Sequence, residues 1–519
     1  MRGRIHVVLI CVLAGAAVVF SVKWLAAPRG VSVLSPVDGT LFPSDIRSPV
    51  VRWTDMDPAH HAWTVRISFK DPRAGLEYAT NEPRWTPSRE VWDAVKKASL
   101  GSQSVLEVCA AGASGESCSR VRFSTSRDAV GAPIFFRAVP NPFPPEEDYV
   151  KIKWKLGRVS SYEPPAVVMK GQTKCFNCHV TSYDGKSFAF IYRTGRAAAR
   201  AGYLLFRTPG KKVSWQWRDY FNWNDVLPES ERKTHYALQS AISPDGRFIV
   251  SGARAMSNIE VTPAKDIISY TMVTKSSLFY YSTEDKTIKP LPGGSDDRYI
   301  RIPSCWSADG RSILYARALV TPQVVEWNLH PADDGTKKSQ QPLTTRELDK
   351  IYPLKYDIYS IPFNGGKGGP ETPVLGASHN GKSNYFARNS PDGKWLVFTQ
   401  SENGGALVRP DSTLFIVPAG GGKPRRLRSN GPGANSWHSW SPNSRWLVFS
   451  SKETSASQTD LVLTHIDENG DDSPRIVLTQ LRDEDGLSAN LPEFFDLQPG
   501  QLEEIDASGV HGERPSAGR

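Results

Sequence analysis

Short apolar and aromatic runs, separated by turn residues, recur along the C-terminal two thirds of the chain. Each run follows a turn of the form Ser-x-Asp-Gly or a near equivalent, as in SPDGKWLVF. Asp-Gly tolerates positive φ and therefore reverses the chain between antiparallel strands. The turns begin at Ser182, Ser243, Ser307, Ser390 and Ser441. Because units of this length fit four-stranded sheets, the repeat predicts a β-propeller of about six blades over residues 173–505.

The residues before the repeat predict a separate β-sandwich at 30–130. Its strand-like runs are separated by Pro, Gly and Asp turns, and they favour an immunoglobulin or fibronectin type. The runs are Val50–Trp53, Trp63–Phe69, Ser104–Cys109 and Ser119–Ser124. The Pro-rich residues 131–172 are predicted to be a connector that contributes an extended segment, and residues 506–519 to be a disordered tail. The predicted fold class is therefore all-β.

The first 29 residues are predicted to direct export. Two arginines precede an uncharged run from residue 5 to residue 22, which is long enough to span a bilayer. Cleavage after Ala27 would place Leu25 at the −3 position and Pro28 directly after the cut, and both are unfavourable. An uncleaved signal anchor is therefore favoured over a cleaved signal peptide. The sequence predicts a periplasmic protein held at the inner membrane by one N-terminal helix, or a secreted protein if the segment is cleaved.

Composition and charge argue against several function classes. The net charge is +9, and Lys and Arg are scattered without a stripe of stacking aromatics, so no nucleic-acid partner is expected. The stretches GGKGG and GGGK lack the helix pattern and the Lys-Ser/Thr of a phosphate loop, and we interpret them as hairpin turns. The absence of a G-x-S-x-G sequence argues against a propeller-gated peptidase.

Four of the six cysteines have structural interpretations. Cys109 and Cys118 flank a Gly-rich stretch, so a disulfide across a hairpin loop is expected in an oxidising compartment. Cys305 is expected to be a buried core thiol, and Cys11 lies in the predicted membrane segment.

The other two cysteines belong to the motif Cys175-Phe-Asn-Cys178-His179, which matches the C-x-x-C-H attachment sequence of c-type haem. Two thiols at this spacing each form a thioether to one vinyl group, and the adjacent imidazole becomes the proximal iron ligand. A plain disulfide is the main alternative. A zinc half-site lacks its second pair, and a thioredoxin-like pair would open a helix, whereas a blade strand follows here. The sequence predicts one covalent haem c.

The sixth iron ligand is open at this point. Methionine or histidine would make an electron carrier, and an open position would allow ligand binding or catalysis. His438, in SWHSWSPN, is expected near the propeller axis, and Met169 lies six residues before Cys175. His235 is a further candidate. We expect at least one histidine to reach the iron and favour His438, with Met169 as the alternative.

Several segments together resemble a family of bacterial TolB-like propeller proteins. They are NSWHSWSPNSRWLVFSSK, SPDGKWLVF, LPEFF and CFNCHVTSYDGKSFAF. Members of that family combine an N-terminal anchor with a C-x-N-C-H haem sequence just ahead of the blades. The resemblance covers roughly residues 130–500. It implies a periplasmic cytochrome-c-like protein and places the haem on Cys175, Cys178 and His179.

The chain departs from the family pattern at Ser444 and Ala308, and we expect both to cost local turn stability rather than function. Three functions are compatible with the sequence. The first is a monohaem protein for periplasmic electron transfer or redox sensing that docks a redox or scaffold partner. The second is a non-catalytic interaction scaffold. The third is a haem-dependent oxidoreductase. An electron-transfer or binding protein is favoured over an enzyme.

Overall fold

The computed structural model describes residues 30–510 apart from short gaps. The gaps are 113–114, 141–145, 174, 184, 194–200, 208–209, 227–237, 254–255, 263–267, 274, 325–342, 352, 405–408 and 454–457. The predicted signal anchor at 1–29 lies outside the described residues. Within them, no helix is both long and apolar enough to cross a membrane.

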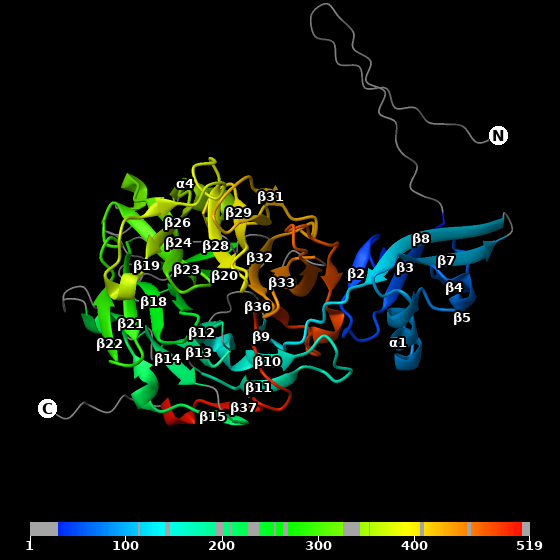
Figure 1. Ribbon diagram of the computed structural model, residues 1–519, viewed down its shortest axis with the longest axis horizontal. Coiled ribbons are helices and arrows are strands. Elements are labelled where there is room, and N and C mark those ends of the chain that lie inside the picture. The colour runs from blue at the N-terminus through cyan, green and yellow to red at the C-terminus, as the bar shows by residue number, and fades with distance from the viewer. Residues whose placement is uncertain are drawn as a thin grey trace, which may run out of the picture.

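The N-terminal unit consists of two sheets packed on each other (Figure 1). One sheet contains β1 (Val31–Ser35), β3 (Val51–Asp55) and β6 (Arg84–Trp85). The other contains β2 (Thr40–Phe42), β8 (Gly115–Thr125), β7 (Ser104–Gly112), β4 (Trp63–Ser68) and β5 (Leu76–Thr80). Trp53 and Trp63 meet edge to face between the two sheets, with ring centroids 6.0 Å apart. Helix α1 (Arg89–Ala98) buries Trp92 against Phe42, at 5.1 Å between ring centroids. The immunoglobulin or fibronectin type remains a prediction.

Six four-stranded sheets, here called blades 1 to 6, make up the larger unit. Their strands are given from the innermost to the outermost. Blade 1 has β36 (Ser488–Phe494), β9 (Ile134–Val139), β10 (Lys153–Gly157) and β11 (Ala166–Lys170); blade 2 has β12 (Cys175–Thr181), β13 (Ser187–Arg193), β14 (Ala201–Arg207) and β16 (Tyr220–Phe221). Blade 3 has β17 (Leu238–Ile242), β18 (Phe248–Ala253), β21 (Ser277–Ser282) and β22 (Thr287–Pro290); blade 4 has β23 (Tyr299–Trp306), β24 (Ser312–Leu319), β26 (Asp357–Pro362) and β27 (Thr372–Pro373). Blade 5 has β28 (Ser383–Asn389), β29 (Trp395–Ser401), β30 (Thr413–Pro418) and β31 (Arg425–Arg426); blade 6 has β32 (Asn435–Trp440), β33 (Trp446–Ser451), β34 (Asp460–His465) and β35 (Ile476–Val477).

The blades close into a propeller-like ring (Figure 1). Each innermost strand contacts the innermost strands of both neighbouring blades, and β36 completes the circle between β32 and β12. β36 also pairs with β9, so blade 1 is built from both ends of the unit. This corrects the prediction of a connector at 131–172, because that segment supplies the three outer strands of blade 1.

The tail prediction also needs correction. β37 (Glu504–Asp506) pairs in parallel with β15 (Lys212–Ser214) at the edge of blade 2. Val510 is fully buried, and its carbonyl oxygen accepts a hydrogen bond from the Tyr192 hydroxyl at 2.7 Å. Residues 506–510 are therefore folded, and 511–519 lie outside the described residues. A further small sheet of β19 (Met256–Thr262), β20 (Ile268–Val273) and β25 (Leu343–Thr344) leads into α4 (Thr345–Ile351).

The repeated turns reverse the chain between antiparallel strands, as the sequence predicts. In the structure these are the innermost and the second strand of each blade that carries the turn. In the copy at Ser243, Oγ donates to Asp245 Oδ1 at 2.6 Å and accepts from the Phe248 N–H at 2.9 Å. The same pair of bonds recurs in the copies at Ser307, Ser390 and Ser441. The fourth residue needs a positive φ, which Gly246 adopts at 70° without steric cost.

Candidate functional site

The C-x-x-C-H motif lies on β12, the innermost strand of blade 2. β12 pairs with β13 from Cys175 to Asn177 and again from Val180 onwards. The backbone of Cys175, Cys178 and His179 therefore forms part of the inner wall of the ring. Of these three side chains, the structure describes that of His179.

A bulge interrupts every innermost strand at the same place. In β12 the pairing shifts between Asn177 and Val180, so Cys178 and His179 together oppose one residue of β13. The other shifts fall between Leu238 and Ser240, Pro303 and Cys305, Tyr385 and Arg388, Ser436 and Ser439, and Asn490 and Glu493. Because bulges re-aim side chains and recur next to functional sites, the residues within them are the first candidates for a role.

His438 and His179 occupy equivalent positions in their blades. Each lies within its bulge and three residues before the turn serine, which is Ser441 in blade 6 and Ser182 in blade 2. Both side chains are 2 % exposed. The two histidines can therefore be compared as the same structural position with different surroundings.

The preceding blade provides a partner for His438. Its Nε2 lies 2.9 Å from the carbonyl oxygen of Val397 on β29. Since a carbonyl only accepts, Nε2 carries the proton of the neutral ring. Burial, helped by the charge of Arg388 and opposed by the bond to Val397, lowers the pKa of His438 to about 3. This bond explains His438 as a residue that ties blade 6 to blade 5.

His179 makes no such bond. The residue of blade 1 that corresponds to Val397 is Phe135, whose ring meets that of His179 edge to face at 4.7 Å between centroids. Phe190 packs on the imidazole at 5.7 Å. Among the described residues, neither Nδ1 nor Nε2 of His179 has a hydrogen-bond partner. The imidazole is thus enclosed by aromatic rings with both nitrogens unused.

The surroundings keep His179 neutral. Burial, together with the charges of Arg137 and Arg388, lowers the pKa of His179 to about 3. The nearby backbone of Leu491 opposes the shift without reaching ordinary hydrogen-bond geometry. A buried polar group without a partner costs about 1–3 kcal/mol, so its presence calls for an explanation. A neutral imidazole with an unused lone pair is suited to bind iron.

The two cysteines fit a haem only if part of β12 changes its pairing. A strand advances about 3.3 Å per residue, so extended backbone separates the Cα atoms of Cys175 and Cys178 by about 10 Å. Two thioether bonds to one macrocycle require this segment to close into a turn. Covalent attachment therefore requires Cys175 to Asn177 to leave the ladder with β13, while the bulge already frees Cys178 from regular pairing.

The two predicted distal ligands that the structure describes, His438 and Met169, have different contacts. His438 is directed to blade 5 by its bond to Val397, whereas His179 packs on blade 1. Met169, on β11 of blade 1, is 4 % exposed and belongs to the hydrophobic cluster that also contains Phe135. Through Phe135, this cluster contacts His179. His235 lies outside the described residues.

A polar cluster that the sequence analysis did not identify crosses the middle of the ring. Arg388 of blade 5 and Glu493 of blade 1 form an ion pair at 2.5 Å. These blades are not neighbours, because blade 6 lies between them in the ring. The Tyr183 hydroxyl of blade 2 donates to the carbonyl oxygens of Trp306 at 3.3 Å and Asn389 at 3.4 Å, on blades 4 and 5. The sequence did contain a feature that could have identified this cluster. Arg388 is a charged residue two positions before a turn serine, where a buried strand is expected.

The same cluster contains Cys305, which is 2 % exposed. Burial raises the pKa of its thiol to about 11, with Arg388 opposing. Burial also raises the pKa of Glu493, and the charge of Arg388 opposes that shift. The prediction of a buried thiol at Cys305 is confirmed, and the paired side chains of this cluster occupy the axis.

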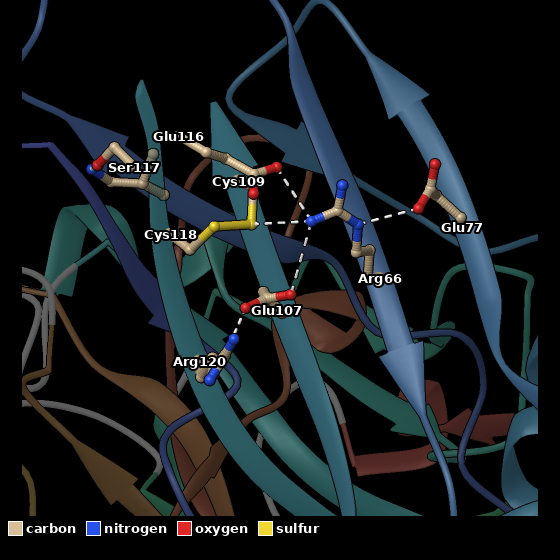
Figure 2. Close-up of a disulfide and its surroundings, with 9 residues drawn as sticks. Arg66, Glu77, Glu107, Cys109, Glu116, Ser117, Cys118 and Arg120 are labelled. Carbon is tan, nitrogen blue, oxygen red and sulfur yellow. Dashed lines mark hydrogen bonds and ion pairs between the residues drawn. A yellow bond between two sulfur atoms is a disulfide. The ribbon is translucent and has the colours of Figure 1, made fainter. Parts of the chain in front are cut away.

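The predicted disulfide between Cys109 and Cys118 is present at directly opposed positions of β7 and β8 (Figure 2). Arg66 Nη1 lies 3.5 Å from Cys109 Sγ and 3.0 Å from a carboxylate oxygen of Glu116. Glu107 and the two sulfurs are the one group of His, Cys, Asp or Glu donors in the described chain whose spacing suits a metal ion. Because both sulfurs are bonded to each other, this group is a disulfide and not a metal site.

Comparisons with known proteins do not assign a family. No family profile and no curated protein matches the sequence. Among solved structures, a nidogen/laminin complex matches with a TM-score of 0.38 and 7 % identity over 72 % of this chain and 100 % of that chain. Oligogalacturonate lyase from Vibrio parahaemolyticus matches with a TM-score of 0.30 and 8 % identity, over 65 % and 92 % of the two chains. A hydrazine synthase chain from Kuenenia stuttgartiensis matches with a TM-score of 0.27 and 12 % identity, over 57 % and 77 %. Likenesses this loose carry no functional argument.

Proposed function

We propose that this protein is an exported c-type cytochrome with one covalent haem, and that it exchanges electrons with a periplasmic protein partner or senses its redox state. One observation carries the proposal: His179, next to Cys178, is a buried neutral imidazole whose two nitrogens have no hydrogen-bond partner in the described chain. The TolB-like family, the immunoglobulin or fibronectin type of the N-terminal unit, and an inner-membrane anchor at 1–29 belong to the same proposal.

His438 serves as an internal comparison for this argument. A histidine needed only to join blades finds its partner in the preceding blade, as His438 does with Val397. His179 stands at the equivalent position and lacks that bond. A purely structural role therefore accounts for His438 and leaves the nitrogens of His179 unexplained.

The roles follow from the residue types. Cys175 and Cys178 would form the thioether bonds, and His179 would be the proximal ligand. When bound, a haem supplies a one-electron couple. The rings of Phe135 and Phe190 hold the imidazole by packing and exclude water from it. We propose Met169 as the sixth ligand ahead of His438, because Nε2 of His438 is already engaged.

Electron exchange is favoured over catalysis on the ring axis. Arg388 and Glu493 neutralise each other there, and Tyr183 spans the ring. A substrate on the axis would have to break these contacts. The proposal therefore assigns the propeller-like ring to partner docking, with a haem-dependent oxidoreductase and a non-catalytic scaffold as the alternatives.

The test is the optical spectrum of full-length protein made together with haem-maturation machinery. We expect a sharp reduced α-band that survives denaturation in the wild type and in His438→Gln. The band should be absent from Cys175→Ala/Cys178→Ala and altered in His179→Ala. A low-spin spectrum supports electron transfer, and a high-spin, ligand-binding iron supports the oxidoreductase. A wild type without covalent haem overturns the proposal and leaves the scaffold.

A further inference from the structure

We propose that the disulfide between Cys109 and Cys118 is a site of thiol–disulfide exchange, which a partner protein carrying two thiols reduces. A thiolate of that partner attacks Cys118, and Cys109 leaves as a thiolate beside the guanidinium of Arg66. This exchange takes place on the N-terminal unit and needs no haem, so it is independent of the function proposed above.

The two sulfurs differ in their access to solvent. Cys118 is exposed on β8, whereas Cys109 is 1 % exposed on β7. A thiolate attacks a disulfide in line with the sulfur–sulfur bond, from the side of the sulfur to which it bonds, and access decides which sulfur is attacked. Cys118 is therefore open to attack, and Cys109 is the leaving group.

The leaving sulfur has a cation beside it (Figure 2). Arg66 Nη1 donates to Cys109 Sγ at 3.5 Å. A nearby arginine lowers the pKa of a thiol, and a thiol of lower pKa leaves faster. Three carboxylates, those of Glu77, Glu107 and Glu116, lie 2.9–3.8 Å from the same guanidinium. Because their charges oppose a thiolate, the departure of Cys109 depends on the cation of Arg66.

The surrounding sheet allows the disulfide to open without loss of the strand pair. β7 and β8 pair in an unbroken register along all 9 residues of β7. Each strand also pairs with a further neighbour, β7 with β4 and β8 with β2. The backbone ladder therefore sets the register of the hairpin by itself. The reduced cysteines stay opposed to each other and can form the disulfide again.

The exchange has two steps. In the first, the thiolate of the partner forms a bond to Cys118 Sγ, the bond between the two protein sulfurs breaks, and its electron pair stays on Cys109 Sγ. In the second, the other thiol of the partner loses its proton and attacks the mixed disulfide, which releases Cys118 as a thiolate. The two protons given up by the thiols of the partner match those that Cys109 and Cys118 take up. The protein gains two electrons, and the partner leaves as a disulfide.

The first experiment compares reduction by dithiothreitol in native buffer and in urea, followed on full-length protein by mass spectrometry of the peptides that contain these cysteines. We expect the native rate to lie within about tenfold of the rate in urea. Arg66→Gln should slow native reduction about threefold or more and leave the rate in urea unchanged. Arg66→Lys should restore most of the native rate.

Arg120→Gln is the matched control. It removes the same charge from a second arginine that pairs with Glu107, and the Nε of Arg120 donates to that carboxylate and not to a sulfur. The rate of native reduction should therefore stay at the wild-type value. Equal native rates in Arg66→Gln and in the wild type, or an equal slowing in Arg120→Gln, overturn the role of Arg66.

The second experiment identifies the attacked sulfur in the wild type, so it does not depend on the folding of a variant. Native protein is treated with glutathione, quenched with iodoacetamide and digested at acidic pH. We expect glutathione on Cys118 and the carbamidomethyl group on Cys109, in about tenfold excess over the reverse. Glutathione mainly on Cys109, or reduction in urea alone, overturns the exchange site. Both results hold with or without covalent haem, which the optical spectrum tests separately.

Discussion

The side-chain oxygen of Ser444 accepts a hydrogen bond from the backbone N–H of Asp392 at 2.9 Å. This bond joins the repeated turn of blade 6 to the repeated turn of blade 5. Ser444 has a φ of 60°, in the region where the equivalent position of blade 5 uses Gly393. The sequence alone predicts that serine costs turn stability here. The structure adds a bond between blades that offsets the cost.

Substitutions at Ser444 separate the two effects. Ser444→Ala removes the bond but keeps a side chain in the left-handed region, so we expect a loss of about 1 kcal/mol. Ser444→Gly removes the bond and also relieves about 1 kcal/mol of backbone strain, so it should stay near the wild type. Urea midpoints of the three proteins provide the measurement. A loss in Ser444→Gly as large as that in Ser444→Ala would contradict the offset.

His438 should make the stability of the ring depend on pH. Its pKa is about 3 when folded, against an ordinary value of 6.5, so only the unfolded chain takes up a proton between these limits. Its contribution is complete above pH 6.5 and is lost as the pH falls towards 3. Between pH 6.5 and pH 5 the loss is about 2 kcal/mol. Between pH 6.5 and pH 5, the free energy of unfolding of His438→Gln should therefore fall by about 2 kcal/mol less than that of the wild type. An equal fall in both proteins would refute a neutral buried His438.

Cys305 should resist alkylation in the native protein. A pKa of about 11 leaves a thiolate fraction about a hundredfold below that of an ordinary thiol with a pKa near 9, and burial slows access further. Mass spectrometry after iodoacetamide treatment at pH 8 measures this directly. We expect Cys305 to be labelled in urea and unlabelled without it. Rapid labelling in the native state would show that the axis is open to solvent.

The disulfide should stabilise the N-terminal unit alone. Cys109 and Cys118 are separated by 9 residues, and closing a loop of this length contributes about 2.5 kcal/mol. Cys109→Ala/Cys118→Ala should therefore unfold residues 30–130 at lower urea while the blades keep their midpoint. Hydrogen exchange resolved by peptide distinguishes the two units. An equal loss of protection in blade 3 would contradict this assignment.

The repeated turn marks five of the six blades individually, and blade 1 lacks it for a physical reason. The Ser-x-Asp-Gly turn connects an innermost strand to the second strand of the same blade. In blade 1 these strands are β36 and β9, which come from opposite ends of the unit, so no turn joins them. A local motif cannot mark a connection that the chain does not make. The Pro-rich residues 131–172 therefore suggest a connector although they contain three strands.

The candidate site was predictable in part. The spacing of Cys175, Cys178 and His179 identifies the motif without structural help. The equivalence of His179 and His438 needs the bulges, because strand pairing shows which residues share a position. The pair of Arg388 and Glu493 joins residues 105 apart in sequence, and only closure of the ring brings them together.

The C-terminal segment should be needed for stability up to residue 510 and not beyond it. Composition predicts disorder from residue 506, yet Leu502, Ile505 and Val510 are at most 4 % exposed, in a hydrophobic cluster shared with blades 1 and 2. Burying three such side chains contributes roughly 4 kcal/mol or more. A chain ending at residue 501 should therefore lose about that much in urea unfolding, and a chain ending at residue 510 should match the full-length protein. Equal stability of the two truncated chains would show that these contacts do not support the ring, because the shorter chain differs from the longer one only by them.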